Sequence, residues 1–308
     1  MISVFDIGGS KVAGSAYVAG SGVSPIETEP TPTQDYFEFC RLLARMTAAG
    51  ASGVGLSIAG VVDPKAGTVR AANIPCLSGK LLASDLEAVT GKPVFLINDA
   101  KAFALAEAHS EDNAQHDIVL GIILGTGIGG ALVINGRCFQ GEQGIAGEWG
   151  HGPASAARTG FALPDWSCGC GQTGCLDVFG GARGLERLHT HLSSHRQSSF
   201  EILKAWEQGD LDAGTTLDVY LDIVGGALAN LVNIFDPSII VAGGGLSGNS
   251  RLLNALEQEL RLRCLAGGNA PGIRPASTGS IAALLGAGIH ASQMVADNQK
   301  SMVRHGET

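Results

Sequence analysis

The sequence predicts an α/β protein built from two related domains, and three observations support this fold class. Strand-like apolar runs alternate with helical patterns along the chain. A strand, a glycine-rich turn and a second strand around Asp6–Lys11 recur about 118 residues later, around Leu124–Gly130. The chain has 308 residues, which is more than one hydrophobic core usually supports.

The expected strands are short apolar runs rich in Val, Ile and Leu. They cover Ile2–Phe5, Val12–Val18, Val54–Ile58, Val94–Ile97, Ile118–Leu124, Ala131–Ile134 and Ile239–Val241. The expected helices have apolar residues three and four positions apart. They cover Phe37–Ala49, Leu81–Thr90, Ala100–Ala108, Leu217–Phe235, Ser250–Cys264 and Ser280–Met294.

A polar stretch, Ser110–Asp117, separates the two repeated units and predicts the domain boundary. The N-terminal domain is therefore expected to cover residues 1–117 and the C-terminal domain residues 118–308. The last helix is a candidate to pack back on the N-terminal domain. A second polar stretch, Ser193–Ser199, is expected to be a loop within the C-terminal domain.

Composition and charge exclude several classes of protein. A hydrophobic content of 45% excludes a disordered chain. The net charge of −9, with no long Lys/Arg run, argues against a nucleic-acid-binding surface. No uninterrupted apolar run reaches the roughly 18 residues of a membrane span, and the first residues lack the pattern of a signal peptide. We expect a cytoplasmic protein with no nucleic-acid or membrane partner.

Glycine accounts for 45 of the 308 residues, about twice its average share. In the turns at Asp6–Lys11 and Gly125–Gly130, glycines let backbone N–H groups close on an anion, which suits phosphate. The Ser10 hydroxyl would donate to phosphate, and Asp6 would orient a hydrated Mg²⁺. Neither turn is a P-loop or a dinucleotide fingerprint. Two ordinary hairpin turns are the alternative interpretation.

Two further motifs stand where an expected strand passes into an expected helix. Gly243–Gly245 follows one strand and suits a flat ring or a phosphate at a helix N-terminus. Asn98 and Asp99 follow another, where the helix N-terminus favours an ionised carboxylate. Asp99 is thus a candidate general base and Asn98 a candidate substrate donor. An ordinary turn and a plain N-cap are the alternatives.

Three of the seven cysteines, Cys168, Cys170 and Cys175, form a C-x-C-x4-C pattern with glycines between them. In a cytoplasmic protein this spacing is more typical of metal binding than of disulfides. Three thiolates would converge on Zn²⁺, and His151 is the nearest upstream candidate for a fourth ligand. Such a site is closed and structural. Free or redox-active cysteines are the alternative.

Taken in chain order, these motifs resemble the ROK family of bacterial sugar kinases and repressors across nearly the whole chain. The segments concerned are D-I-G-G-S-K, N-D-A, L-G-T-G-I-G-G, E-W-G-H, C-G-C-G-Q-T-G-C and V-A-G-G-G-L-S. The resemblance implies the actin-like ATPase (ribonuclease H-like) fold, with two α/β domains closing over sugar and ATP. It also implies a homodimer, with sugar and phosphate binding in the first domain, and ATP binding and the zinc loop in the second.

The resemblance further implies a role for individual residues. Asp99 would be the catalytic base. The sugar would contact Asn73, Ser78, Gly79, Asn98, Asp99, Glu148, His151 and Asp177. Mg-ATP would contact Asp6, Gly8, Gly9, Ser10, Lys11, Gly125, Thr126, Gly127, Gly244 and Gly245. Structural Zn²⁺ would be held by His151, Cys168, Cys170 and Cys175.

The stretch Asn73–Lys80 resembles the sugar loop of the family's N-acetylglucosamine kinases. Small residues at 78 and 79 would leave room for a 2-acetamido group, so phosphorylation of N-acetyl-D-glucosamine at its 6-hydroxyl is expected. Three residues depart from the family pattern. Asp177 replaces a sugar-binding Glu, Ala59 replaces a Pro, and Lys101 replaces an Asn, where its charge would lower the pKa of Asp99.

Several other functions fit parts of this pattern. A glucokinase, a fructokinase or an N-acetylmannosamine kinase would differ in the sugar alone. A transcriptional repressor of the family would need an N-terminal helix-turn-helix, for which the turn at Asp6 leaves no room. A non-catalytic sugar sensor would be expected to lack the base, which is present.

Overall fold

The computed structural model describes residues 1–63, 65, 67–71 and 73–306. Contacts group the chain into two compact units. Unit 1 comprises Met1–Ser110, Arg137–Ala146 and Thr278–Thr308, and unit 2 comprises Glu111–Gly136 and Gly147–Ser277. The division into domains 1–117 and 118–308 stays a prediction.

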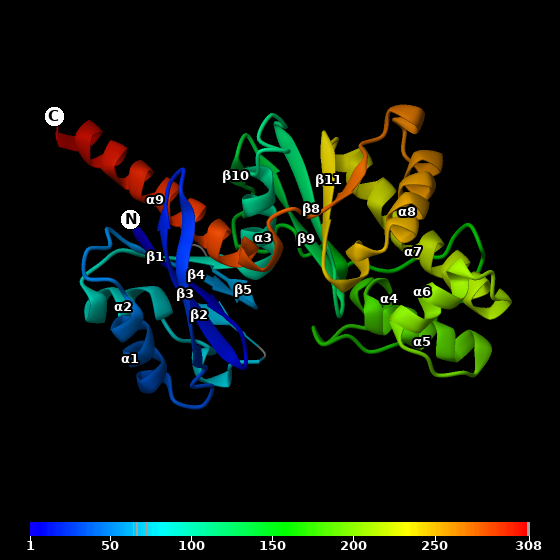
Figure 1. Cartoon of the computed structure of the whole chain (residues 1–308), viewed down its shortest axis with the longest axis horizontal. Helices are drawn as coiled ribbons and strands as arrows, with labels where there is room; N and C mark the ends of the chain where they lie inside the picture. Colours follow the sequence, from blue (N-terminus) through cyan, green and yellow to red (C-terminus); the bar gives the residue numbers. More distant parts are fainter. Residues whose placement is uncertain (64, 66, 72, 307–308) are drawn as a thin grey trace. The chain divides into compact units, whose positions relative to one another are not determined.

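Unit 1 contains a five-stranded sheet in the order β3-β2-β1-β4-β7 (Figure 1). Its strands are β1 (Ile2–Ile7), β2 (Lys11–Val18), β3 (Gly22–Pro30), β4 (Val54–Ile58) and β7 (Val94–Asn98). The β1–β2 and β2–β3 pairs are antiparallel, whereas β4 runs parallel to both β1 and β7. Strands β5 (Val61–Val62) and β6 (Val69–Arg70) form a separate small hairpin.

Helices cover the apolar residues of this sheet. Helices α1 (Tyr36–Met46) and α2 (Leu82–Thr90) supply Phe39, Leu43 and Leu86 to a core that contains Phe5 and Leu56. Helices α3 (Asp99–Ala108) and α9 (Ala282–Gly306) pack on each other, and both contact β4 and β7.

Glycines permit the closest approaches of α9. A Cβ at Gly286 would lie 1.9 Å from the carbonyl oxygen of Ala102 in α3, and one at Gly55 would lie 2.5 Å from that of Ala287. Part of the glycine excess therefore serves helix packing in unit 1.

Unit 2 repeats the strand arrangement at the centre of unit 1. Strands β8 (Ile118–Leu124) and β9 (Ile128–Ile134) form an antiparallel hairpin, and β11 (Ile239–Gly243) pairs in parallel with β8. Strand β12 (Ile273–Pro275) extends the sheet beyond β11. In both units, a hairpin with a glycine turn thus lies beside a parallel strand.

The helices of unit 2 enclose one large core. They are α4 (Asp177–Gly180), α5 (Ala182–Ser193), α6 (Ser199–Glu207), α7 (Leu211–Phe235) and α8 (Ser250–Arg263). Tyr220 of α7 is fully buried, and its hydroxyl donates to the carbonyl of Gly180 at 2.6 Å. This bond ties the central helix to the short helix α4 and the turn that follows it.

The expected elements are all present, with changes at their ends. Val54–Ile58 and Ile118–Leu124 are confirmed as strands with the expected bounds. The expected second glycine turn, Gly125–Gly130, was too long, because β9 begins at Ile128. The expectation also missed β3, β12, α5 and α6.

Two helical stretches, Leu211–Phe235 and Gly279–Lys300, are long and apolar enough to cross a membrane by length and composition. Of their most apolar windows, 67% and 44% of the residues are buried inside the protein. The core helix of a soluble protein passes the same test, so these helices are weak evidence of a membrane span.

Candidate active site and metal centre

The first glycine turn joins β1 to β2 in unit 1. The amide of Gly8 donates to the Lys11 carbonyl at 3.0 Å, and the Thr31 hydroxyl donates to the Gly8 carbonyl at 2.7 Å. Among the described residues, the amides of Gly9 and Ser10 meet no acceptor. The structure thus groups the predicted phosphate-binding amides of this turn on one short loop.

Asp6, at the end of β1, is partly buried beside this turn. Burial raises the pKa of its carboxyl, while the nearby Ser57 hydroxyl and the charge of Lys11 oppose the increase. Lys11 itself is exposed, directly after the turn. A bound cation would favour the ionised form of Asp6, which agrees with its predicted role towards hydrated Mg²⁺.

The second glycine turn joins β8 to β9 in unit 2 and consists of Gly125, Thr126 and Gly127. The carbonyls of Gly125 and Thr126 accept hydrogen bonds from the first amides of α5, those of Ala182 at 2.8 Å and Arg183 at 3.2 Å. The turn is therefore fixed from outside the hairpin.

Asp177 also holds this turn. Its Oδ1 accepts a hydrogen bond from the amide of Ile128 at 3.0 Å. A Cβ at Gly127 would lie only 2.0 Å from the same oxygen, so a larger residue there would displace the carboxylate. The structure thus gives this predicted sugar ligand a contact with the phosphate turn that the sequence did not indicate.

A cavity of about 1040 Å³ adjoins the second turn within unit 2. It brings together three predicted nucleotide residues, Gly125, Thr126 and Gly245. Gly244, which precedes Gly245, has a φ of +88°, and a Cβ there would lie 2.4 Å from the Leu124 carbonyl oxygen. The third glycine cluster therefore places its backbone directly against the end of β8.

Other residues of this cavity were not predicted. They are Ala182, Arg183, Glu186, Ser199, Phe200, Leu203, Lys204, Glu207, Leu246, Gly248 and Asn249. Most come from α5 and α6, the two helices that the sequence patterns missed. The polar N-cap Ser198 with Glu201, which forms a capping box at the start of α6, is the signal that was available.

In unit 1, the candidate base is the first residue of α3. Asn98 is the N-cap, because its Oδ1 accepts from the amide of Lys101 at 3.1 Å. Its side-chain amide donates to the Gly60 carbonyl at 2.9 Å and to Asp99 Oδ1 at 3.0 Å. The backbone amide of Ala100 donates to the same Asp99 oxygen at 2.8 Å. The N-cap interpretation is thus correct, and the cap also orients the carboxylate.

The residues of the predicted sugar loop, Asn73, Ser78 and Gly79, are exposed. A Cβ at Gly9 would lie 3.1 Å from the Cβ of Asn73, so the first glycine turn touches this loop. A Cβ at Gly79 would have no described atom within 4 Å. Ala59, one of the departures from the family pattern, directly follows β4.

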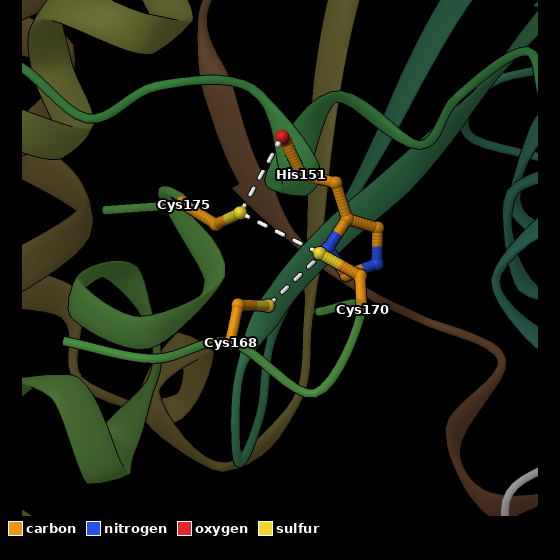
Figure 2. A group of neighbouring side chains, drawn as sticks. All are labelled: His151, Cys168, Cys170 and Cys175. Atoms are coloured by element: carbon orange, nitrogen blue, oxygen red, sulfur yellow. Dashed lines mark hydrogen bonds between the residues drawn. The ribbon is translucent and has the colours of Figure 1, made fainter. Parts of the chain in front are cut away.

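The cluster of His151, Cys168, Cys170 and Cys175 is brought together as predicted, with the four ligand atoms all within 4.8 Å of one another (Figure 2). The Sγ of Cys168 lies 3.6 Å from Nδ1 of His151, and the Sγ atoms of Cys170 and Cys175 are 3.7 Å apart. Tetrahedral Zn²⁺ with Zn–S bonds near 2.3 Å requires sulfur atoms about 3.8 Å apart. The donor atoms and their spacing therefore fit this ion.

His151 has its two ring nitrogens in different surroundings. Nδ1 faces the cysteines, whereas Nε2 lies 3.7 Å from Oε2 of Glu148. Both side chains are part-exposed on the short turn Trp149–His151 and its N-cap. A metal on Nδ1 would thus be backed by a carboxylate at the other nitrogen, an arrangement that fixes the imidazole ring.

Comparisons with known proteins identify relatives of this chain. Residues 2–294 match the ROK family. The chain is 39% identical over 292 residues to a Salmonella paratyphi C (strain RKS4594) protein named N-acetyl-D-glucosamine kinase, covering 92% of this chain and 96% of that protein. It is similar to the ROK hexokinase from Thermus thermophilus, with 34% identity, a TM-score of 0.83, and coverage of 96% and 99%. It is also similar to a ROK family glucokinase from Streptomyces griseus in complex with glucose and AMPPNP, with 29% identity, a TM-score of 0.72, and coverage of 94% and 98%.

This chain therefore belongs to the ROK family. The resemblance found in the motifs is confirmed, and so is the α/β fold of the actin-like ATPase class.

Proposed function

We propose that this protein transfers the γ-phosphoryl group of Mg-ATP to the 6-hydroxyl of N-acetyl-D-glucosamine. The chain is a sugar kinase of the ROK family. The choice of sugar and the roles of the residues go beyond that class. The role of Asp99 is supported by the geometry at the start of α3, where Asn98 and the amide of Ala100 hold its carboxylate. The choice of sugar is supported by the 39% identity to a protein named N-acetyl-D-glucosamine kinase.

In the proposed mechanism, Asp99 is the general base. Its Oδ1 is held by two hydrogen bonds. The carboxylate takes the proton of the sugar 6-hydroxyl, and the sugar oxygen attacks the γ-phosphorus. The bond from that phosphorus to the bridging oxygen breaks, and ADP leaves with the electron pair. Positioning and charge neutralisation supply most of the acceleration.

Asn98 acts on the base in this mechanism. Both protons of its side-chain amide already have acceptors, namely the Gly60 carbonyl and Asp99. Its role towards the sugar is therefore to fix the orientation of the carboxylate, and its Oδ1 serves as the helix cap.

The nucleotide is assigned to the cavity beside the second turn. Gly125, Thr126 and Gly127 would meet the phosphates, and Gly244 and Gly245 the nucleoside. Arg183 lines the same cavity and adds a positive charge there. The first turn, with Asp6, Gly8, Gly9, Ser10 and Lys11, would meet the phosphates and hydrated Mg²⁺.

The cysteine cluster is proposed to hold a structural Zn²⁺. With three thiolates and one imidazole the ion has no open position, so its contribution is to fix the loop and His151. Nε2 of His151 and the carboxylate of Glu148 are then presented to the sugar. Removal of zinc is expected to leave the ATP KM unchanged and to raise the sugar KM. Metal analysis with kinetics on chelated protein and on Cys168→Ser would measure this; chelated protein with an unchanged sugar KM would contradict it.

Substitution of the base tests the mechanism. Asp99→Asn is expected to lower kcat by about 10² to 10⁴-fold, the usual contribution of a general base. Sugar binding, measured by calorimetry, is expected to persist. A folded Asp99→Asn protein with the wild-type rate would exclude Asp99 as the base.

A glucokinase, a fructokinase or an N-acetylmannosamine kinase is the second candidate function. The 29% identity to a ROK glucokinase favours keeping it. The exposed loop with Ser78 and Gly79 supports the acetamido sugar instead. Measurement of kcat/KM over a panel of hexoses and N-acetylhexosamines decides; a preference for glucose, fructose or N-acetylmannosamine would overturn the assignment.

We also propose a cytoplasmic homodimer that binds neither nucleic acid nor membrane. The net charge of −9 supports the first exclusion. The absence of a membrane partner is supported by the burial of most of the apolar part of α7 inside the protein. Light scattering of the purified protein measures the oligomeric state, and a monomer at working concentration would contradict the dimer.

A further inference from the structure

Helix α3 contains two buried charged side chains, Lys101 with 3% exposure and Glu107 with none. Burial of a charge is unfavourable unless strong polar contacts compensate it. These two residues therefore require an explanation beyond the helix itself. Asp99 stands at the start of the same helix, two positions before Lys101.

Both side chains hold parts of unit 1 that are distant in sequence. Glu107 accepts hydrogen bonds from the amide of Thr278, at 2.8 Å, and from the Thr278 hydroxyl. Lys101 donates to the carbonyl of Gly144. Thr278 begins the last segment of unit 1, and Gly144 lies in the short segment Arg137–Ala146. Each charge thus fixes a segment that enters unit 1 from unit 2.

Further hydrogen bonds hold the segment Arg137–Ala146 in place. Its first residue, Arg137, makes two hydrogen bonds to Asp297 of α9, at 2.7 and 2.9 Å. The amide of Ala146 donates to the Gln140 carbonyl at 3.2 Å, which closes the segment on itself. Gly144 is buried and has a φ of +72°. Lys101 therefore binds the buried part of this closed segment. Helix α3 also contacts β10 (Arg137–Cys138), the strand with which the segment begins (Figure 1).

This segment leads directly to predicted sugar ligands. Ala146 is its last residue, and Glu148 follows two positions later. Gly147, between them, has a φ of +97°, and a Cβ there would lie 2.6 Å from the Gly130 carbonyl oxygen. The backbone therefore has little conformational freedom between Gly144, which Lys101 contacts, and Glu148.

We propose that Lys101 is a positioning residue for sugar binding. Its ammonium group fixes the segment Arg137–Ala146 against the helix that begins with Asp99, and so fixes the point from which the chain proceeds to Glu148. This inference rests on the proposed function for the role of Glu148. It is separate from the expectation that the charge of Lys101 lowers the pKa of Asp99, which stays a prediction, because it rests on the contact of the ammonium group with Gly144.

The test compares Lys101→Met with Lys92→Met. Lys92 also donates from Nζ to backbone carbonyls of unit 1, those of Ala49 at 2.9 Å and Ala51 at 2.8 Å, but it does not touch the segment. Lys101→Met is expected to raise the KM of the best hexose about 10-fold or more, while kcat and the ATP KM change less than about threefold, since ground-state sugar binding is lost. Lys92→Met is expected to keep all three values.

Two readouts separate positioning from other roles. Positioning leaves the pH dependence of kcat unchanged in Lys101→Met; a shift would instead mean that the charge acts on Asp99, and would overturn the proposal. Hydrogen exchange of the amides at 140–146 is expected to be at least about 10-fold faster in Lys101→Met than in Lys92→Met. This readout needs no substrate, so it holds even if the wild-type protein phosphorylates no hexose and the proposed function fails.

A second variant covers the case in which Lys101→Met does not fold. Arg137→Gln removes the exposed contact with Asp297 that holds the other end of the same segment. It is expected to raise the sugar KM about threefold and to accelerate exchange at 140–146, because the same segment is loosened. Unchanged sugar KM and unchanged exchange in the folded variants would overturn the proposal.

Discussion

The two glycine turns have similar sequences but are held in different ways. The turn at Gly8–Lys11 is closed by its own hairpin and by the Thr31 hydroxyl, and its tip touches the exposed residue Asn73. The turn at Gly125–Gly127 is held by the first amides of α5 and by the Asp177 carboxylate. The first turn has neighbours that can shift, whereas the second is fixed by backbone and by a short buried helix. A glycine motif alone therefore does not reveal how rigidly the turn that contains it is held.

Among the substitutions that compare how the two turns are held, Gly181→Ala is expected to have the largest effect. A Cβ at residue 181 would lie 2.4 Å from the Cα of Gly127, so the backbone of the second turn or of α5 must move. A displacement of about 1 Å in a positioning element can cost about 100-fold in rate. We expect a loss of that order in kcat/KM for ATP, measured by initial rates with varied nucleotide.

A matched control for this variant is Gly214→Ala, where nothing lies within 4 Å of the added Cβ. It is in helix α7, so the substitution is expected to keep the activity and to favour the helix. A folded Gly181→Ala protein with wild-type ATP kinetics would mean that the second turn is not rigidly held.

The Asp177 carboxylate is the next contact to break. Asp177→Ala leaves the buried amide of Ile128 without its acceptor, which costs about 1–3 kcal/mol. That penalty falls on the free energy of unfolding. The loosened turn is expected to lower kcat/KM for ATP by about 10-fold, less than a displacement of about 1 Å would. Asp177→Asn keeps an acceptor oxygen for the amide of Ile128, so it is expected to retain most of the kcat/KM for ATP. Kinetics with both substrates varied distinguish the roles: a higher sugar KM in Asp177→Asn indicates contact with the sugar.

Gly9→Ala changes the first turn in the same way but is expected to have a smaller effect. Its Cβ would lie 3.1 Å from the Cβ and 3.3 Å from the backbone oxygen of Asn73, so this exposed residue must move by only a few tenths of an ångström. We expect less than about a threefold loss in kcat, the range in which a small displacement is absorbed. A loss as large as that in Gly181→Ala would show that the two turns are equally rigid.

The smallest effect is expected from Thr31→Val, which removes the hydroxyl that donates to Gly8. One such hydrogen bond contributes about 1 kcal/mol net. Denaturant unfolding would report this loss, while the ATP KM stays within about twofold because the hairpin bond from Gly8 to Lys11 remains. A large change in the ATP KM would show that this single hydroxyl sets the shape of the turn.

Much of the fold could be predicted where burial dominates the sequence. Strands β4 and β8 are almost wholly buried, and their runs of mostly apolar residues gave the observed bounds. Strand β3 was missed because most of its residues are exposed at a sheet edge and include Ser24, Glu27 and Glu29. Helix α5 was missed because it carries two arginines and two histidines among its apolar positions.

The site was predictable where a motif is local and less so where it depends on distant backbone. The spacing of the three cysteines was sufficient to predict the cluster with His151. The occupied amide of Asn98 depends on the carbonyl of Gly60, 38 positions away, and could not be foreseen. The contact of Asp177 with Ile128 likewise spans 49 positions.

The division of unit 1 into three sequence segments has a consequence for the order in which the chain is made. Helix α9, which packs on β1, β4 and β7, is synthesised after all of unit 2. Until it emerges from the ribosome, one apolar face of the first sheet lacks its largest covering helix and has only α3 against β4 and β7, although its strands have long been complete. Because chains fold as they are made and exposed apolar surface favours aggregation, the nearly continuous unit 2 is the part that can complete its core first. A growing chain would therefore depend most on chaperones for the part that carries Asp99.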